Sequence, residues 1–329
     1  MHDEASPALA AVHLVGSNIA SSTALLPSNG IVELAFDRPL SPLCISRQTF
    51  ALHDVDGYFP APIVAYDPVA RIVSLTPLGS LDSDHVYEVD VRTPTNPDDL
   101  YGLRSVDGAT LAQANLSVAF SVGGPDTTGR SIPSAPTIDF CRDIFPVFSN
   151  KCGTSACHGG PLPVEGLSLD SPAGIALTAI GQVARGANTG PTSSPQPPSL
   201  AFGVNMPIID PGPGSPSAGN PGNSWLLYKL LMEEPAASSS TPYASACDGG
   251  TVEPVSTDSV HVVAWEPLST SDRMALSAVI SGQAMPPPST SADGTENTAL
   301  SEDELERVSV WIASGAAVPS QCGCLTGSQ

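Results

Sequence analysis

The chain has 329 residues, which is long enough for two hydrophobic cores. It carries 12 Lys and Arg against 33 Asp and Glu residues, and the net charge of −21 argues against binding to nucleic acid or to an anionic membrane. No stretch approaches the roughly 18 apolar residues of a membrane-spanning segment.

The first residues, Met1 to Glu4, are acidic, whereas a secretory signal peptide begins with basic residues. The apolar run from Ala8 to Val15 therefore predicts a first strand rather than the core of a signal. We expect that a signal peptide either has been removed or precedes the given start.

The first third of the chain has the pattern of an all-β domain. Short apolar segments separated by turn residues predict antiparallel strands, and their regular spacing predicts a β-sandwich. These segments are residues 31–36, 62–66, 71–75, 85–91 and 116–122. His53 and His85 fall on strands or strand edges, where we expect a solvated or hydrogen-bonded imidazole rather than a metal ligand.

Several motifs in this region carry a resemblance to a known domain type. They are Phe36-Asp-Arg-Pro-Leu40, Phe50 to Gly57, Tyr66-Asp-Pro followed by Arg71-Ile-Val, Leu75-Thr-Pro, and the strands with Tyr87 and Phe120. The region resembles bacterial Ig-like domains of the surface-layer type over residues 8–124. The resemblance implies an N-terminal Ig-like sandwich that serves as a spacer, docking or adhesive module. A Gly-, Pro- and Ser-rich linker is expected at residues 125–137.

The most informative motif of the second part is Cys152-Gly-Thr-Ser-Ala-Cys157-His158. Two thiols followed by an imidazole can attach a haem covalently through its vinyl groups and ligate its iron. Four residues separate these cysteines, instead of the two of the common signal. The alternative, a Cys152–Cys157 disulfide with His158 as an exposed polar residue, stays open on these residues alone.

Helices are expected on both sides of this motif. Residues 137–148 place Phe140, Ile144, Val147 and Phe148 at helical spacing, with Pro146 shifting or bending the helix. Further helices are expected at 223–232 with Ser224 as N-cap, at 272–281, and at 301–314, where Ser301 and Glu304 form a capping box.

Met285 is the favoured second axial ligand. It precedes Pro286, Pro287 and Pro288, which would stiffen the loop, and a thioether opposite a histidine raises the potential of a haem. The other interpretation is that Met285 fills a gap in the core. Competing ligands are Met206, Met232 and Met274, and His261 could also reach the metal.

Two long segments rich in Pro, Gly and Ser, residues 186–222 and 235–260, are expected to be surface insertions that frame one edge of the haem.

The chain has seven cysteines, and five of them remain for other roles when Cys152 and Cys157 are assigned to haem. We expect Cys141 to pair with Cys322 or Cys324, stapling the first helix to the last, and a second disulfide to use the remaining one of these with Cys247. Cys44 is expected to be buried alone in the sandwich.

The order of these parts resembles the cytochrome c domains of envelope proteins from planctomycete- and myxobacterium-like organisms. The resemblance covers residues 138–320 and includes, besides the motifs above, Gly166-Leu-Ser-Leu-Asp170, Asp210-Pro-Gly and Trp311-Ile-Ala-Ser-Gly-Ala316. It implies a mainly α, cytochrome c-like haem domain over 138–325. It also implies one covalent haem c held by Cys152, Cys157, His158 and the distal Met285. The wide cysteine spacing and the 186–222 insertion depart from the family pattern.

Three functions therefore remain open. The favoured one is a monohaem c-type cytochrome, an electron carrier rather than an enzyme, with a redox protein as its partner. The second is a non-haem, disulfide-stapled surface or adhesion module. The third is a peroxidase-like haem enzyme, in which the sixth position would be open and His261 would be the distal residue. Attachment of haem c implies a periplasmic, outer-membrane-associated or extracellular protein, and a lipid anchor lost with the signal stays open.

Overall fold

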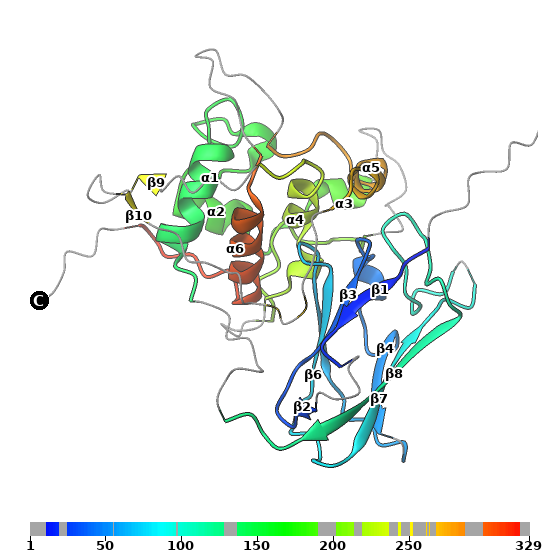
Figure 1. Ribbon diagram of the computed structural model, residues 1–329. Helices are drawn as coiled ribbons and strands as arrows, with labels where there is room; N and C mark the ends of the chain where they lie inside the picture. Colours follow the sequence, from blue (N-terminus) through cyan, green and yellow to red (C-terminus); the bar gives the residue numbers. More distant parts are fainter. Residues whose placement is uncertain are drawn as a thin grey trace, which may run out of the picture.

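The computed structural model describes residues 11–19, 25–54, 56–96, 98–127, 137–189, 202–213, 219–236, 243–244, 251–252, 261, 263, 268–286 and 299–322. The described chain is rich in β-sheet in its first part and mainly helical in its second (Figure 1). The predicted domain boundaries at 8–124, 125–137 and 138–325 stay a prediction.

Two four-stranded sheets lie between residues 14 and 123 (Figure 1). In the first, β1 (Leu14–Ser17), β3 (Val32–Phe36), β6 (Ile72–Thr76) and β5 (Ile63–Asp67) pair in that order. In the second the order is β2 (Leu26–Pro27), β8 (Asn115–Gly123), β7 (Val86–Arg92) and β4 (Phe50–Asp54). All neighbours are antiparallel except β2 and β8, which are parallel. The short helix η1 (Pro42–Cys44) connects β3 to β4.

The two sheets share one hydrophobic core because their strands alternate inward and outward side chains. In β7, Tyr87, Val89 and Val91 are buried, whereas Glu88 and Asp90 between them are partly exposed. Strand β3 departs from this alternation, since all five of its residues are buried. Its other face is covered by the helical part, where Ala35 packs with Val263.

The second part of the chain contains six α-helices and shorter helical turns in its described residues. They are η2 (Phe140–Ile144), α1 (Phe145–Lys151), η3 (Val164–Gly166), α2 (Pro172–Thr178), α3 (Arg185–Thr189), η4 (Pro221–Asn223), α4 (Trp225–Leu230), α5 (Thr270–Val279) and α6 (Glu302–Ala313). Strands β9 (Tyr243–Ala244) and β10 (Thr251–Val252) pair antiparallel as a small separate sheet.

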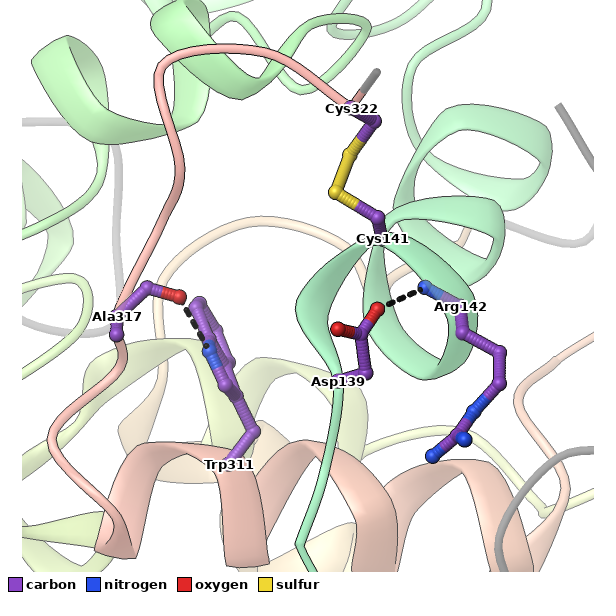
Figure 2. The surroundings of a disulfide bond; sticks show 6 residues. All are labelled: Asp139, Cys141, Arg142, Trp311, Ala317 and Cys322. Carbon is purple, nitrogen blue, oxygen red and sulfur yellow. Dashed lines mark hydrogen bonds between the residues drawn. A yellow bond between two sulfur atoms is a disulfide. The ribbon is translucent and has the colours of Figure 1, made fainter. Parts of the chain in front are cut away.

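The first and last helices pack through aromatic rings. Trp311 of α6 lies 5.5 Å from the ring of Phe140 and 5.9 Å from the ring of Phe148, measured between centroids. Its indole Nε1 donates a hydrogen bond of 3.1 Å to the carbonyl of Ala317 (Figure 2). The Trp311 ring is therefore packed between aromatic side chains, and its buried N–H group has a hydrogen-bond acceptor.

A disulfide between Cys141 and Cys322 joins this same pair of helical regions, as expected (Figure 2). Cys44 is buried as a free thiol in the sandwich, also as expected. Cys247 and Cys324 lie outside the described residues.

Some helix details differ from the sequence-based expectations. The predicted first helix is divided into a π-helical turn, η2, and α1, with Pro146 in the first turn of α1, where its missing N–H costs nothing. Asp139 caps η2 by accepting from the Arg142 amide (Figure 2). Ser224 does not cap α4, because its hydroxyl accepts from the Asp210 amide and donates to the Asn220 carbonyl.

The expectation that residues 186–222 form a surface insertion is wrong for one stretch. Phe202, Met206 and Ile209 are buried in the helical core. Phe202 packs edge-on against Trp225 and Tyr228. A short apolar run flanked by Pro and Gly therefore contributes to the core. The segment 235–260 lies mostly outside the described residues.

Candidate cofactor cavity

A cavity of about 700 Å³ opens in the helical part, and the candidate ligands from the sequence line it together. Cys152, Cys157, His158 and Met285 all contribute to its wall. The first three come from the loop after α1, and Met285 follows α5, more than a hundred residues later. The volume lies within the ~300–1,000 Å³ range of cofactor and ligand sites.

The loop that bears the two cysteines is closed tightly upon itself. The amide of His158 donates to the carbonyl of Cys152 at 3.0 Å, and the amide of Cys157 donates to that of Thr154 at 2.9 Å. Any Cβ at Gly159 would lie 2.0 Å from the Gly153 carbonyl oxygen, so only glycine fits there. The four intervening residues thus form a compact turn rather than an extended excursion.

The His158 side chain is held by its backbone surroundings. Its side chain is largely buried, and Nδ1 lies 3.2 Å from the carbonyl oxygen of Val164. Because a carbonyl only accepts, Nδ1 carries the proton in this contact, and Nε2 keeps its lone pair. Burial also lowers the pKa of His158, although hydrogen bonds to Val164 and Leu167 oppose this shift. The neutral imidazole is the form that binds a metal.

Cys152 and Cys157 are free thiols in different environments. Cys152 is buried, and this desolvation raises the pKa of its thiol to about 12, with the neighbouring Cys157 adding to the shift. Cys157 is partly exposed. No disulfide joins them, so both sulfur atoms are available for another bond.

Met285 is the methionine that faces the cavity. Met206 and Met232 are buried in the core, and the side chain of Met274 is largely exposed. Among the described methionines, only Met285 belongs to the cavity wall. Pro286 lies beside it in the wall, while Pro287 and Pro288 lie outside the described residues.

The suggestion that His261 could reach the metal is wrong. His261 lies where the helical part meets the sheets, with Nδ1 3.2 Å from Glu33 Oε1 and Nε2 3.5 Å from Asp67 Oδ2. Burial alone would lower its pKa, but hydrogen bonds and charge interactions with the two carboxylates outweigh burial and raise the pKa to about 10. His261 is therefore an imidazolium in an ion-pair cluster, and it is absent from the cavity wall.

The rest of the wall is mostly apolar, with two ammonium groups. Trp225, Leu226, Leu230, Ile208 and Leu169 contribute apolar surface. Lys151 and Lys229 also line the cavity, and they are the two lysines of the whole chain. The motifs did not point to either lysine. Lys151 directly precedes Cys152, and this position in a chain with two lysines was a usable signal, whereas nothing in the sequence marks Lys229.

Lys151 and Lys229 are held in different ways. The Nζ atom of Lys151 donates to Glu304 Oε2 at 2.7 Å and to the Ala299 carbonyl at 2.9 Å. Lys229 donates only to backbone carbonyls, those of Ser281 and Gln283. Near the cavity rim, Arg185 and Glu165 form an exposed ion pair at 3.7 Å.

A separate group of metal-ligand type lies on the sandwich. His53, Glu88 and Asp90 each place one ligand atom within 4.8 Å of the others. His53 Nε2 pairs with Asp90 at 2.9 Å, as expected for a hydrogen-bonded histidine. Hydrogen bonds with Asp54 and Asp90 raise the pKa of His53. His85, which directly precedes β7, is exposed.

Helices of the described chain are all too short or too polar to span a membrane. No protein-family model and no curated protein matches the chain.

Three of the solved structures that match do so weakly. The native conformation of E. coli α2-macroglobulin is 11% identical with a TM-score of 0.26, covering 35% of this chain and 6% of that one. The N-terminal part of the bacterial S-layer protein SbsC is 13% identical with a TM-score of 0.23, covering 35% and 24%. The S-layer protein rSbsC is 14% identical with a TM-score of 0.25, covering 37% and 15%. The chain spans less than a quarter of each, and TM-scores this low support no argument about function.

Proposed function

We propose that the cavity holds one haem c and that the protein is a monohaem c-type cytochrome, an electron carrier that works outside the cytoplasm. Cys152 and Cys157 would form the thioether bonds, and His158 and Met285 would ligate the iron. We infer further that the sheets form an Ig-like domain of the surface-layer type and that the helices form a cytochrome c-like domain.

One observation carries this proposal: two free thiols, an oriented imidazole and a thioether line the same cavity. Three of these groups are adjacent in sequence, but Met285 is brought to them only by the fold. This donor set is the one that covalent, His/Met-ligated haem requires.

The wall suits a flat apolar group with acidic substituents. Aromatic and aliphatic side chains such as Trp225 and Leu230 exclude water from most of the cavity. The Lys151 ammonium is paired with Glu304, whereas Lys229 donates to backbone carbonyls. Lys229 therefore places positive charge at the same wall, which favours a ligand that carries carboxylates. When bound, haem supplies an iron that gains and loses one electron. The chain itself provides attachment, ligands and a dry surrounding.

The alternatives have less support. A disulfide-stapled surface module would pair Cys152 with Cys157, whereas both are free thiols. A peroxidase-like enzyme would need a distal acid–base group, yet His261 is engaged with Glu33 and Asp67. Apart from His158, no described histidine lines the cavity.

The Cys141–Cys322 disulfide supports a secreted or cell-surface location, because such bonds persist in oxidising compartments. The choice among periplasm, outer membrane and exterior stays a proposal, as does a redox protein as partner. A basic partner would suit the net charge of −21.

The test is a pyridine haemochrome spectrum of the protein expressed with the haem c maturation machinery. We expect a covalent c-type spectrum for the wild type and its loss in the Cys152→Ala/Cys157→Ala double variant. Cys44→Ala is the matched control, since Cys44 is a free thiol buried in the sandwich. A colourless wild type, matured beside a working cytochrome, would overturn the proposal.

A further inference from the structure

We propose that Lys229 is a positioning residue that holds the segment Ser281–Met285 in place, so that the Met285 side chain faces the cavity. This inference rests on the proposed function for its consequence at the iron. Its structural part, the tether itself, can be measured with or without haem.

Three hydrogen bonds connect this one residue of α4 to the segment. The Nζ atom donates to the carbonyl of Ser281 at 2.9 Å and also to the carbonyl of Gln283. The Lys229 carbonyl accepts from the amide of Met285 at 3.3 Å. The side chain of Lys229 therefore holds the start and the middle of the segment Ser281–Met285, and its backbone carbonyl holds the end at Met285.

The charge of Lys229 makes the two side-chain bonds strong. In the described part of the chain Lys229 has no carboxylate partner, and backbone carbonyls take that place. Hydrogen bonds from an ionised donor are about twice as strong as neutral ones. Desolvation lowers the pKa of Lys229 to about 8, which agrees with an ammonium group that lies largely out of water.

The shape of the segment fits this tether. Gly282 has a φ of +78°, and a Cβ built on it would lie 3.5 Å from Lys229 Nζ. The chain therefore turns around the ammonium group at this glycine. From the other side, Gly186 approaches so closely that a Cβ there would lie 2.7 Å from Ser281 Oγ.

The base of the tether is rigid. Leu227 and Tyr228, the two residues before Lys229, are fully buried, and the Tyr228 hydroxyl donates to the Gly222 carbonyl at 2.8 Å. The segment itself is less buried, since Gly282 and Gln283 are exposed. Without Lys229, little else in the described structure would hold the carbonyls of Ser281 and Gln283.

The experiment compares the full-length mature protein with its Lys229→Met and Lys229→Arg variants. Hydrogen exchange at the Met285 amide reports the tether, and the near-infrared charge-transfer band of Met-ligated ferric haem reports ligation. We expect Lys229→Met to speed exchange at Met285 by at least about tenfold, as for the loss of a charge-assisted hydrogen bond, and to weaken the band. Lys229→Arg should restore part of both signals.

Lys151→Met is the matched control, because it removes the other cavity lysine without touching this segment. Exchange at Met285 should stay at the wild-type rate in that variant. If Lys229→Met does not fold, Gly282→Val strains the same turn from the segment side and should also speed exchange.

Wild-type exchange at Met285 in a folded Lys229→Met variant would overturn the inference. So would a weakened band that Lys229→Arg does not restore at all. If the wild type carries no haem, the proposed function fails, and the exchange measurement alone then decides whether Lys229 holds the segment.

Discussion

Individual side chains define the chemistry of the cavity, and some of them could be found from sequence alone. Cys152, Cys157 and His158 are neighbours in the chain, so their spacing carries the prediction. Met285 was predicted from its place before a proline run, and it does line the cavity. Its role as a ligand stays a prediction.

The roles of Lys229 and His261 could not be predicted in the same way. Lys229 contacts backbone carbonyls 52 and 54 residues away, and such contacts leave no pattern in side-chain types. His261 pairs with Glu33, 228 residues distant. A histidine in the same half of the chain as the haem motif suggests a ligand, but the fold places two carboxylates against His261 instead.

Replacing Met285 tests the axial ligand directly. We expect Met285→Ala to keep covalent haem, because the thioether bonds do not involve Met285, and to leave the sixth iron position open. Carbon monoxide should then bind the reduced variant readily but the wild type poorly, as followed by absorption spectra. Met274→Ala, a change at an exposed methionine, is the control and should behave as wild type. Equal carbon monoxide binding by wild type and Met285→Ala would argue against ligation.

At the scale of helices and strands, the sequence predicted an element correctly where its residues show a clear periodic pattern. The five strands predicted between residues 31 and 122 are present because alternation and turn residues agree with the sandwich. The first strand, predicted over Ala8 to Val15, is β1, which begins only at Leu14. The parallel strand β2 was missed, since two residues carry no periodicity. The run Phe202–Ile209 was predicted to lie on the surface, because the proline- and glycine-rich sequence around it is typical of surface loops, but three of its side chains are buried in the core.

Helix α6 is the element whose start the sequence predicted best. The Ser301 hydroxyl accepts from the Glu304 amide at 3.3 Å, and the Glu304 carboxylate accepts from the Ser301 amide at 2.7 Å. Glu304 also pairs with Lys151 at 2.7 Å, so the cap is connected to the helix that precedes the cysteine loop.

We therefore expect Ser301→Ala to lower the free energy of unfolding by about 1 kcal/mol, the usual loss for a helix cap. Urea denaturation followed by far-UV circular dichroism measures this change. Ser277→Ala, at an exposed position of α5, should change stability by less than about 0.5 kcal/mol. A loss in Ser301→Ala no larger than in this control would show that the capping box contributes little.

Across the whole molecule, the sheets and the helices meet through charged groups as well as apolar ones. Arg38 lies 2.7 Å from Asp107 within the sheet region and 3.5 Å from Asp272 of α5. His261 joins Glu33 of β3 and Asp67 of β5 to the helical part. These pairs are largely screened from water, so loss of one partner would leave the other charge poorly compensated.

The His261 cluster predicts a particular dependence of stability on pH. The pKa of His261 rises from 6.5 in the unfolded chain to about 10 in the folded one. A raised pKa means that the folded state binds the proton more tightly, so this contribution is complete below pH 6.5. It declines as the pH rises and is lost above pH 10. Urea denaturation from pH 6 to pH 10.5 should show this decline.

Removing the imidazole tests the same cluster at fixed pH. His261→Ala removes the imidazolium that pairs with Glu33 and Asp67, and the loss of one partner of such a largely buried ion pair should cost about 3–5 kcal/mol at pH 7. The variant should also lose the decline between pH 6.5 and 10. His85→Ala, at an exposed histidine, is the control. A His261→Ala variant with the wild-type pH profile would assign the decline to other groups.

The Cys141–Cys322 disulfide has a topological consequence for the intact chain. It closes a covalent ring between two cysteines separated by 181 positions in the sequence, and that ring contains every residue that lines the cavity. The two four-stranded sheets lie outside the ring, and their only covalent connection to it is the backbone that leads into Cys141. A protease that cuts the backbone once inside the ring opens it without separating the pieces. Such a nicked protein would migrate as two fragments only after reduction, whereas a cut between residues 127 and 137 would release the sandwich from the ring's covalent frame at once.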